Sequence, residues 1–240
     1  MEGEREPVAR YATCVAPVRS RRHDDAVTTD SASARPSVLG LAPVIPVVVL
    51  DDAADAVPLA RALVAGGLPA VEVTLRTPVA LDAIRAIAAG VPDAVVGAGT
   101  VLDAEAVAAS AAAGARFLVS PGSTERLLTA MDDSGLPYLP GVSTVSEAMG
   151  LLERGVTEMK FFPAEASGGI AYLKSLGSPL PRARFCPTGG VTAESAPKYL
   201  ALANVGCVGG TWMLPKAALA AKDWATVEKL AAEAAALGKG

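Results

Sequence analysis

The chain has 240 residues, of which 51% are apolar, and 21 basic against 25 acidic side chains give it a formal net charge of −4. The apolar fraction is ample for a core and excludes global disorder. The only histidine is His23. This count excludes a zinc site built from several imidazoles, and it leaves Ser-His-Asp or Cys-His catalysis dependent on one residue. Acid–base chemistry is therefore expected from carboxylates, lysine or water.

Several classes of partner are disfavoured by the composition. No basic cluster is available to neutralise nucleic-acid phosphates, although local dipoles can still bind a small anion. The three cysteines (Cys14, Cys186 and Cys207) are too few and too irregular for a disulfide framework or a metal knuckle. The longest apolar run, residues 41–50, is too short to span a membrane, and no apolar signal segment opens the chain. We expect a soluble cytoplasmic protein.

The first 37 residues differ from the rest. They contain six arginines and six acidic residues, several Ser and Thr, and no sustained periodicity. This composition predicts a flexible N-terminal extension or a start-site artefact over residues 1–37, followed by one domain over residues 38–240.

From residue 38 onward, short β-rich runs alternate with amphipathic helical stretches, which indicates βα units and a parallel sheet. The helical stretches include residues 51–67, 77–90, 102–114 and 143–155, several of them closed by glycine. Eight such units in about 200 residues predict a single-domain α/β protein with a (β/α)8 TIM-barrel fold. A doubly wound open sheet is the alternative, but the strand count and the Gly- and Pro-rich strand ends favour the barrel. The eight runs are residues 43–50, 70–75, 94–99, 116–122, 137–142, 158–164, 184–190 and 205–210.

The last helix is expected over residues 223–237, with Asp223 as its N-cap. Helical spacing places Trp224, Val227, Leu230 and Ala231 on one face. That apolar face predicts a helix that covers the outside of the barrel.

Glu72 is a carboxylate inside the otherwise apolar strand AVEVTL. Alternation places Glu72, Thr74 and Arg76 on one face of the strand, as expected for a site at a strand end. The simpler interpretation is a Glu–Arg ion pair that satisfies the barrel interior.

Lys160 is an ammonium group inside the strand EMKFFPA, next to Phe161 and Phe162. It could be an ordinary strand-end lysine, paired with a carboxylate or extended to solvent. In an apolar pocket its pKa would instead be lowered, and the neutral amine could add to a ketone to form an imine. Lys160 and Glu72 together are candidates for a nucleophile and a proton-transfer base.

Two glycine turns finish the last two strands: Thr188-Gly189-Gly190 and Gly209-Gly210-Thr211. Each alone is a weak signal, because Gly-Gly is common in tight turns. Together they occupy the loops in which barrels commonly bind phosphate through backbone N–H groups. A phosphorylated small-molecule substrate is therefore expected. Cys186 and Cys207, set among apolar residues, are interpreted as small buried hydrophobes.

Seven motifs now occur in an order that resembles the 2-dehydro-3-deoxy-6-phosphogluconate (KDPG) and 4-hydroxy-2-oxoglutarate (KHG) aldolase family. The resemblance extends from about residue 38 to residue 237. It implies a class I, metal-independent lyase without a cofactor, which cleaves KDPG to pyruvate and glyceraldehyde 3-phosphate in the Entner–Doudoroff pathway and assembles as a homotrimer. The motifs are EVTLRT (72–77), VGAGTV (96–101), SPG (120–122), PGVSTVSE (140–147), KFFPAE (160–165), FCPTGG (185–190) and GGTW (209–212).

The resemblance also implies residue roles. Lys160 would form the Schiff base and Glu72 would be the general acid/base. The other implied roles are binding of the pyruvate carboxylate by Arg76 and Thr100, packing against the pyruvyl methyl by Pro121 and Phe162, contact with the aldehyde hydroxyls by Thr188, and phosphate binding by Gly189, Gly190, Gly209 and Gly210.

One position departs from the family pattern, because Thr211 stands where relatives commonly have serine. The hydroxyl is kept, so phosphate binding is expected to persist, while the extra methyl could shift the balance between phosphorylated and shorter substrates. Three alternatives stay open: an aldolase that prefers 2-dehydro-3-deoxy-6-phosphogalactonate, a phosphate-binding barrel isomerase or epimerase that uses Glu72, and a non-catalytic binding module. The last is disfavoured because no expected catalytic residue is missing.

Overall fold

The structure is a computed structural model that describes residues 36–238. The extension predicted over residues 1–37 lies outside the described residues, apart from Pro36 and Ser37. The Glu158 carboxylate accepts hydrogen bonds from the Ser37 hydroxyl (2.6 Å) and from the N–H groups of Val38 and Leu39 (3.0 and 3.3 Å). These bonds join the first described residues to the strand that contains Lys160. The predicted domain boundary at residue 38 stays a prediction.

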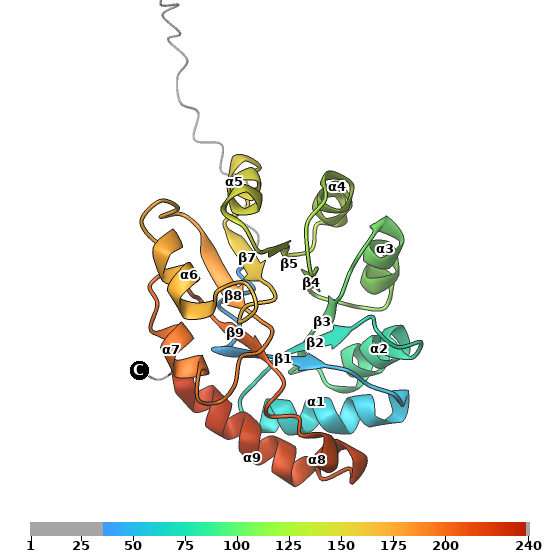
Figure 1. The fold of residues 1–240 in the computed structure, drawn as a ribbon. Helices are drawn as coiled ribbons and strands as arrows, with labels where there is room; N and C mark the ends of the chain where they lie inside the picture. The colour runs from blue at the N-terminus through green and yellow to red at the C-terminus, as the bar shows by residue number, and fades with distance from the viewer. Residues whose placement is uncertain (1–35, 239–240) are drawn as a thin grey trace, which may run out of the picture. The chain divides into compact units, whose positions relative to one another are not determined.

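The strands lie at the centre of the molecule and the helices surround them (Figure 1). Every strand pair is parallel. Within the described residues the strands are β1 (Val44–Val48), β2 (Ala70–Thr74), β3 (Val95–Gly99), β4 (Leu118–Val119), β5 (Tyr138–Leu139), β6 (Gly141–Val142), β7 (Glu158–Phe161), β8 (Arg184–Pro187) and β9 (Val208–Gly210). Each of the eight predicted runs therefore contains a strand, and the curled parallel sheet confirms the α/β class.

The helices follow the strands along the chain. Within residues 36–238 they are the α-helices α1 (Ala56–Ala65), α2 (Ala80–Gly90), α3 (Ala104–Ala112), α4 (Glu125–Ser134), α5 (Val145–Glu153), α6 (Gly169–Leu176), α7 (Ala196–Leu200), α8 (Lys216–Ala220) and α9 (Trp224–Ala235), and the 3-10 helices η1 (Ala53–Asp55) and η2 (Ala236–Gly238). None of these helices combines the length and apolarity that a bilayer crossing requires.

The strands form two hydrogen-bonded sheets. Six strands pair in the order β5-β4-β3-β2-β1-β9, and three pair in the order β6-β7-β8. Two isolated parallel bridges, Phe185 with Val205 and Thr188 with Gly209, join residues of the β8 segment to residues of the β9 segment. The sheet thus curls so that its late strands approach its first one.

The strand expected over residues 137–142 is divided into β5 and β6 by Pro140. Proline has no N–H to donate to a ladder, which explains the interruption. Its carbonyl still accepts a hydrogen bond from the Lys160 N–H (2.9 Å). One segment therefore pairs with β4 through its first half and with β7 through its second.

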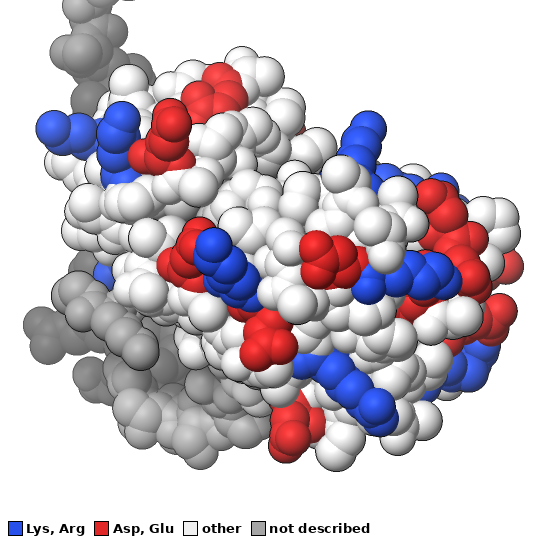
Figure 2. Space-filling model, turned by 90° about the horizontal axis from the view of Figure 1, so that it is seen from below, with Lys and Arg blue, Asp and Glu red and all other residues white. Residues whose placement is uncertain are grey.

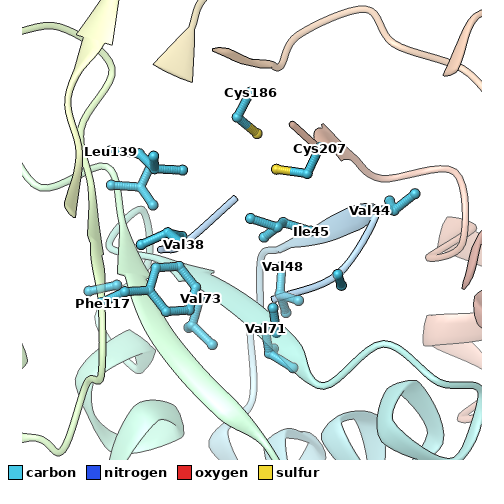
Figure 3. Close-up of a cluster of buried hydrophobic side chains, with 14 of the residues drawn as sticks. Val38, Val44, Ile45, Val48, Val71, Val73, Phe117, Leu139, Cys186 and Cys207 are labelled. Carbon is cyan, nitrogen blue, oxygen red and sulfur yellow. The ribbon is translucent and has the colours of Figure 1, made fainter. Parts of the chain in front are cut away.

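Buried side chains fill the interior of the curled sheet. Ile45, Phe117, Cys186 and Cys207 are buried, and the two sulfur atoms face each other across the interior (Figure 3). A hydrogen bond with Cys186 and complete burial raise the pKa of the Cys207 thiol. Both cysteines are free and buried, which agrees with their interpretation as small hydrophobes.

The C-terminal helix α9 begins as predicted. The Asp223 carboxylate accepts a hydrogen bond from the Thr226 N–H (3.1 Å), and Val227 and Ala231 are buried. A Cβ placed on Gly66, at the end of α1, would lie 2.5 Å from the Ala231 Cβ. Glycine therefore lets α1 and α9 approach closely, and α9 packs on the outer layer.

The surface carries both signs of charge. Seen from below, basic and acidic side chains lie next to each other in small groups, and wide uncharged areas separate these groups (Figure 2). The described residues on this face form no continuous basic patch for a polyanion.

Candidate active site

Lys160 on β7 and Glu72 on β2 meet in the interior of the curled sheet. Each is only 3% exposed, and Lys160 Nζ donates a hydrogen bond to Glu72 Oε1 at 3.3 Å. A buried ammonium or carboxylate without a partner would be costly, so each group makes the burial of the other tolerable. The sequence predicted both residues in strands, and the fold joins them across 88 positions.

One glycine on a neighbouring strand makes space for Glu72, and another makes space for the main chain beside Lys160. Thr74 pairs with Gly99 in register, and a Cβ on Gly99 would lie 2.2 Å from Glu72 Oε1. On the other side, Gly141 pairs with Lys160, and a Cβ on Gly141 would lie 2.2 Å from the Pro121 carbonyl. The main chain of Pro121 therefore fills the space beside the residue paired with Lys160.

An aromatic ring lies over the amine. Lys160 Nζ is 5.1 Å from the centroid of the Phe162 ring. At this distance the ring face attracts a cation, and the ring also shields the nitrogen from water. Phe162, expected near the methyl of bound pyruvate, is thus next to the Lys160 amine.

Arg76 and Thr100 form a second polar pair just past β2 and β3. Arg76 Nε donates a hydrogen bond to Thr100 Oγ1 (3.2 Å). Thr100 has a positive φ of 59°, which a β-branched residue rarely adopts. The guanidinium has further N–H donors in a planar fork that suits a carboxylate.

Thr74, placed in the same polar row by the strand alternation, has a structural contact. Its hydroxyl donates to the Val48 carbonyl at 3.0 Å and is buried. Of the three residues in the predicted row, Thr74 therefore bonds to β1. Glu72 and Arg76 have polar partners in the candidate site.

Thr188 follows β8 and is buried. Its hydroxyl donates to the Cys186 carbonyl (3.4 Å) and lies 3.7 Å from the Cys186 sulfur. A Cβ on Gly209 would lie 2.2 Å from Thr188 Oγ1. Gly209 therefore leaves room for this hydroxyl, a contact that the sequence did not indicate.

The two glycine pairs differ in structure. Gly189 and Gly190 have φ values of 97° and 82°, in the region that favours glycine. Gly209 and Gly210 were expected in a turn, but they belong to β9 and pair with Ile45 and Pro46 of β1. A Cβ on Gly210 would lie 1.9 Å from the Trp212 ring, so close packing also requires glycine there.

A cavity of about 680 Å³ opens beside Thr211, between the end of β1 and helices α8 and α9. Its lining includes Val47, which pairs in register with Glu72. The cavity therefore extends from the exposed Thr211 toward the strand next to the buried carboxylate. Within residues 36–238, no group of three or more His, Cys, Asp or Glu is arranged to hold a metal ion.

Two residues beside the glycine loop were not predicted as part of the site. Glu165 ends the KFFPAE motif, and its carboxylate accepts a hydrogen bond from the Tyr199 hydroxyl at 2.7 Å. The motif was a usable signal for Glu165, whereas nothing in the sequence placed Tyr199, 34 positions later, beside it.

The KDPG and KHG aldolase family model matches residues 36–230. The KHG/KDPG aldolase of Escherichia coli K12 is 52% identical over 198 residues, which cover 82% of this chain and 93% of that protein.

Two solved structures of KDPG aldolases are also similar. The enzyme of Legionella pneumophila, with pyruvate captured as a covalent carbinolamine, has a TM-score of 0.80 and 45% identity, covering 82% of this chain and 96% of that one. The enzyme of Zymomonas mobilis ZM4, with 3-phosphoglycerate, has a TM-score of 0.79 and 50% identity, covering 83% of this chain and 93% of that one.

Proposed function

The chain belongs to the KDPG and KHG aldolase family, and we propose that this lyase cleaves KDPG to pyruvate and glyceraldehyde 3-phosphate through an imine on Lys160. The observation that carries the proposal is the buried Lys160, whose Nζ lies 3.3 Å from Glu72 Oε1. An amine held next to a carboxylate can exchange a proton with it and add to a ketone. The carbinolamine of the Legionella pneumophila relative is the adduct that such an addition produces.

In the proposed reaction, the neutral Lys160 amine adds to the C2 ketone and water leaves. The protonated imine then accepts the electron pair of the C3–C4 bond as that bond breaks. Glu72, directly or through a water, takes the proton of the C4 hydroxyl, and glyceraldehyde 3-phosphate departs. Protonation of the enamine at C3 and hydrolysis of the imine release pyruvate and restore the amine.

We assign the carboxylate of the substrate to Arg76 and Thr100. The Arg76–Thr100 hydrogen bond orients the guanidinium, whose remaining N–H groups can form charge-assisted hydrogen bonds to a carboxylate. Pro121 and Phe162 are assigned to the pyruvyl methyl, because the Phe162 ring lies next to Lys160 Nζ. Holding both groups fixes C2 relative to the amine.

We assign the phosphate to the N–H groups of Gly189, Gly190, Gly209 and Gly210 and to the Thr211 hydroxyl. Positive φ angles at Gly189 and Gly190 support this assignment, since such backbone can turn successive N–H groups toward an anion. The Thr188 hydroxyl, buried at the start of the Gly189–Gly190 loop, is assigned to the hydroxyls of the aldehyde part.

Substrate preference is the finer part of the proposal. KHG would be a second, unphosphorylated substrate, as the name of the Escherichia coli relative states for that protein. A preference for the phosphogalactonate epimer is the alternative, because epimers differ in the placement of one hydroxyl. Values of kcat/KM on the three substrates decide the order, and we expect KDPG first.

Three further properties complete the proposal. We infer that the two sheets together form one closed (β/α)8 barrel. Isolated bridges join the β8 segment to the β9 segment, and residues 138–142 pair with both β4 and β7. A homotrimer is proposed from family resemblance, and a cytoplasmic location is proposed from the few, irregularly spaced cysteines. Sedimentation of the full chain tests the first, and fractionation of cells tests the second.

Trapping tests the mechanism. Pyruvate with borohydride should inactivate the protein and leave a reduced adduct on the peptide that contains Lys160, as seen by mass spectrometry. Lys174, an exposed lysine of α6, provides the matched control: Lys174→Ala should be trapped normally and Lys160→Ala should not. An unmodified Lys160 peptide would refute the imine and would favour the isomerase or epimerase alternative.

A further inference from the structure

We propose that Glu165 and Tyr199 are positioning residues that determine the affinity for the phosphorylated end of the substrate, by holding the Gly189–Gly190 loop in place. This inference rests on the proposed function and names a further determinant of the same site. Neither residue is expected to touch the reacting atoms.

The loop is joined to the strand of Lys160 by main-chain hydrogen bonds. Beyond β7 and β8, Thr188 N–H donates to the Phe161 carbonyl (3.0 Å) and Ala164 N–H to the Thr188 carbonyl (2.8 Å). Glu165 N–H then donates to the Gly189 carbonyl (3.1 Å). The last of these bonds places the Glu165 backbone directly beside the proposed phosphate loop.

The Glu165 side chain packs against that loop with its aliphatic part. A Cβ on Gly190 would lie 2.6 Å from Glu165 Cγ and 2.8 Å from its Cβ, and apart from its chain neighbours it would meet no other atom of residues 36–238 within 4 Å. The carboxyl group is therefore farther from Gly190 than the methylene groups are. The negative charge is thereby held away from the loop that is assigned to the phosphate.

Tyr199 determines this orientation. It is fully buried on α7, and its hydroxyl donates to Glu165 Oε1 at 2.7 Å, while Glu165 itself is exposed. Burial, and then the bond to the Glu165 carboxylate, raise the pKa of the Tyr199 phenol, so the phenol stays a donor at neutral pH. Without this donor, an exposed carboxylate would be free to rotate toward the phosphate and repel it.

A comparison of two ligands distinguishes the effect of the Glu165–Tyr199 pair on phosphate binding from a general effect on folding. KDPG occupies both ends of the site, whereas pyruvate reaches only the Lys160 end. Tyr199→Phe keeps the buried ring and removes only the donor. We expect it to raise the KM for KDPG about tenfold, because the released Glu165 carboxylate would repel the phosphate, and to leave the pyruvate concentration for half-maximal borohydride inactivation within twofold.

Two variants complete the design. Glu165→Gln keeps an acceptor for the Tyr199 hydroxyl and removes the charge, so its KM for KDPG should stay within threefold of wild type. Tyr172→Phe is the matched control, because it also removes one tyrosine hydroxyl. The ring of Tyr172 in α6 stacks on Phe161 of β7 (ring centroids 5.6 Å apart), and we assign it no role in holding the loop. It should change neither measurement.

An unchanged KM in Tyr199→Phe would overturn the inference. So would equal changes for KDPG and pyruvate, or a Glu165→Gln defect as large as that of Tyr199→Phe. Failure of the proposed function is recognised separately, since wild type would then not be trapped by pyruvate and borohydride at all.

Discussion

The Lys160–Glu72 region and the Gly189–Gly190 loop are both assigned to one substrate, but they differ in exposure and in the kind of group that they offer. The first consists of two charged side chains from strands β7 and β2, each 3% exposed. The second consists of main chain, and Gly190 is exposed. A reacting amine gains from a site that excludes water, because its protonation is then controlled by one neighbour. An anion is instead bound by N–H groups that need no side chain. Changes in the first region should therefore affect kcat, and changes in the second should affect KM.

Glu72→Gln should give the largest effect. The amide can still fill the space beside Lys160 but cannot take a proton, so kcat should fall by about 10²–10⁴-fold. Pyruvate should still be trapped on Lys160 by borohydride. Steady-state kinetics and mass spectrometry of the trapped protein check the two parts. Unchanged turnover would remove Glu72 from the mechanism.

Gly99→Ala tests whether Glu72 needs the space that the missing Cβ of Gly99 leaves. The side chains of Glu72 and Lys160 are themselves unchanged. Its Cβ would lie 2.2 Å from Glu72 Oε1, so the carboxylate must move. Displacement by about 1 Å can cost about 10²-fold in rate, and we expect kcat to fall by about ten- to a hundredfold. Gly150→Ala is the control, because a Cβ there meets nothing within 4 Å. Equal kcat values for the two variants would contradict the prediction.

Gly190→Ala should affect the other kinetic constant. The position has a φ of +82°, and a Cβ would lie 2.6 Å from Glu165 Cγ, so the loop must shift. We expect the KM for KDPG to rise about tenfold, the equivalent of one weakened hydrogen bond to a charged group, with little change in kcat. Gly135→Ala shares the backbone strain (φ +69°) but has free space around its Cβ. The control should lose stability alone; a similar rise in its KM would show that strain is the cause.

The smallest effect is expected from a helix cap that belongs to neither region. Glu147 accepts hydrogen bonds from the N–H groups of Ser143 and Thr144 at the start of α5. Partial burial alone would raise the pKa of Glu147, but these bonds lower it below its usual value of 4.5. Glu147→Ala should cost about 1 kcal/mol in free energy of unfolding at pH 7, with kcat and KM unchanged.

The pH dependence has a definite sign. The carboxylate is favoured in the folded state, so its stabilising effect is present above pH 4.5 and is lost as the pH falls through the lowered folded pKa. Urea unfolding of wild type and Glu147→Ala should give a larger difference at pH 7 than at pH 3. A difference that is equally large at pH 3 would assign the effect to packing.

Local patterns were enough to locate the strands and the unusual charges. Each predicted run contains a strand, because alternation and Gly- or Pro-rich ends are properties of a few adjacent residues. Lys160 and Glu72 were recognisable because a charge in an apolar strand is conspicuous. The division at Pro140 could also have been anticipated, since proline cannot donate to a ladder.

Features that depend on distant residues were not predictable. The contact of Gly209 with the Thr188 hydroxyl depends on how β8 approaches β9. The Tyr199–Glu165 bond joins a short helix to a turn 34 positions earlier. Thr74 was placed in the site by alternation, yet its hydroxyl bonds to the Val48 carbonyl because β1 lies beside β2. Each of these contacts is set by tertiary packing.

The hydrogen bonds at Glu158 have a consequence for how the chain is made. Ser37 and its partner are separated by 121 positions, so the first described residues leave the ribosome long before the carboxylate that will receive them. Glu158 is also two residues from Lys160 in β7. We therefore expect the strand of Lys160 and residues 37–39 to become ordered together, late in synthesis, because contacts across long loops form slowly.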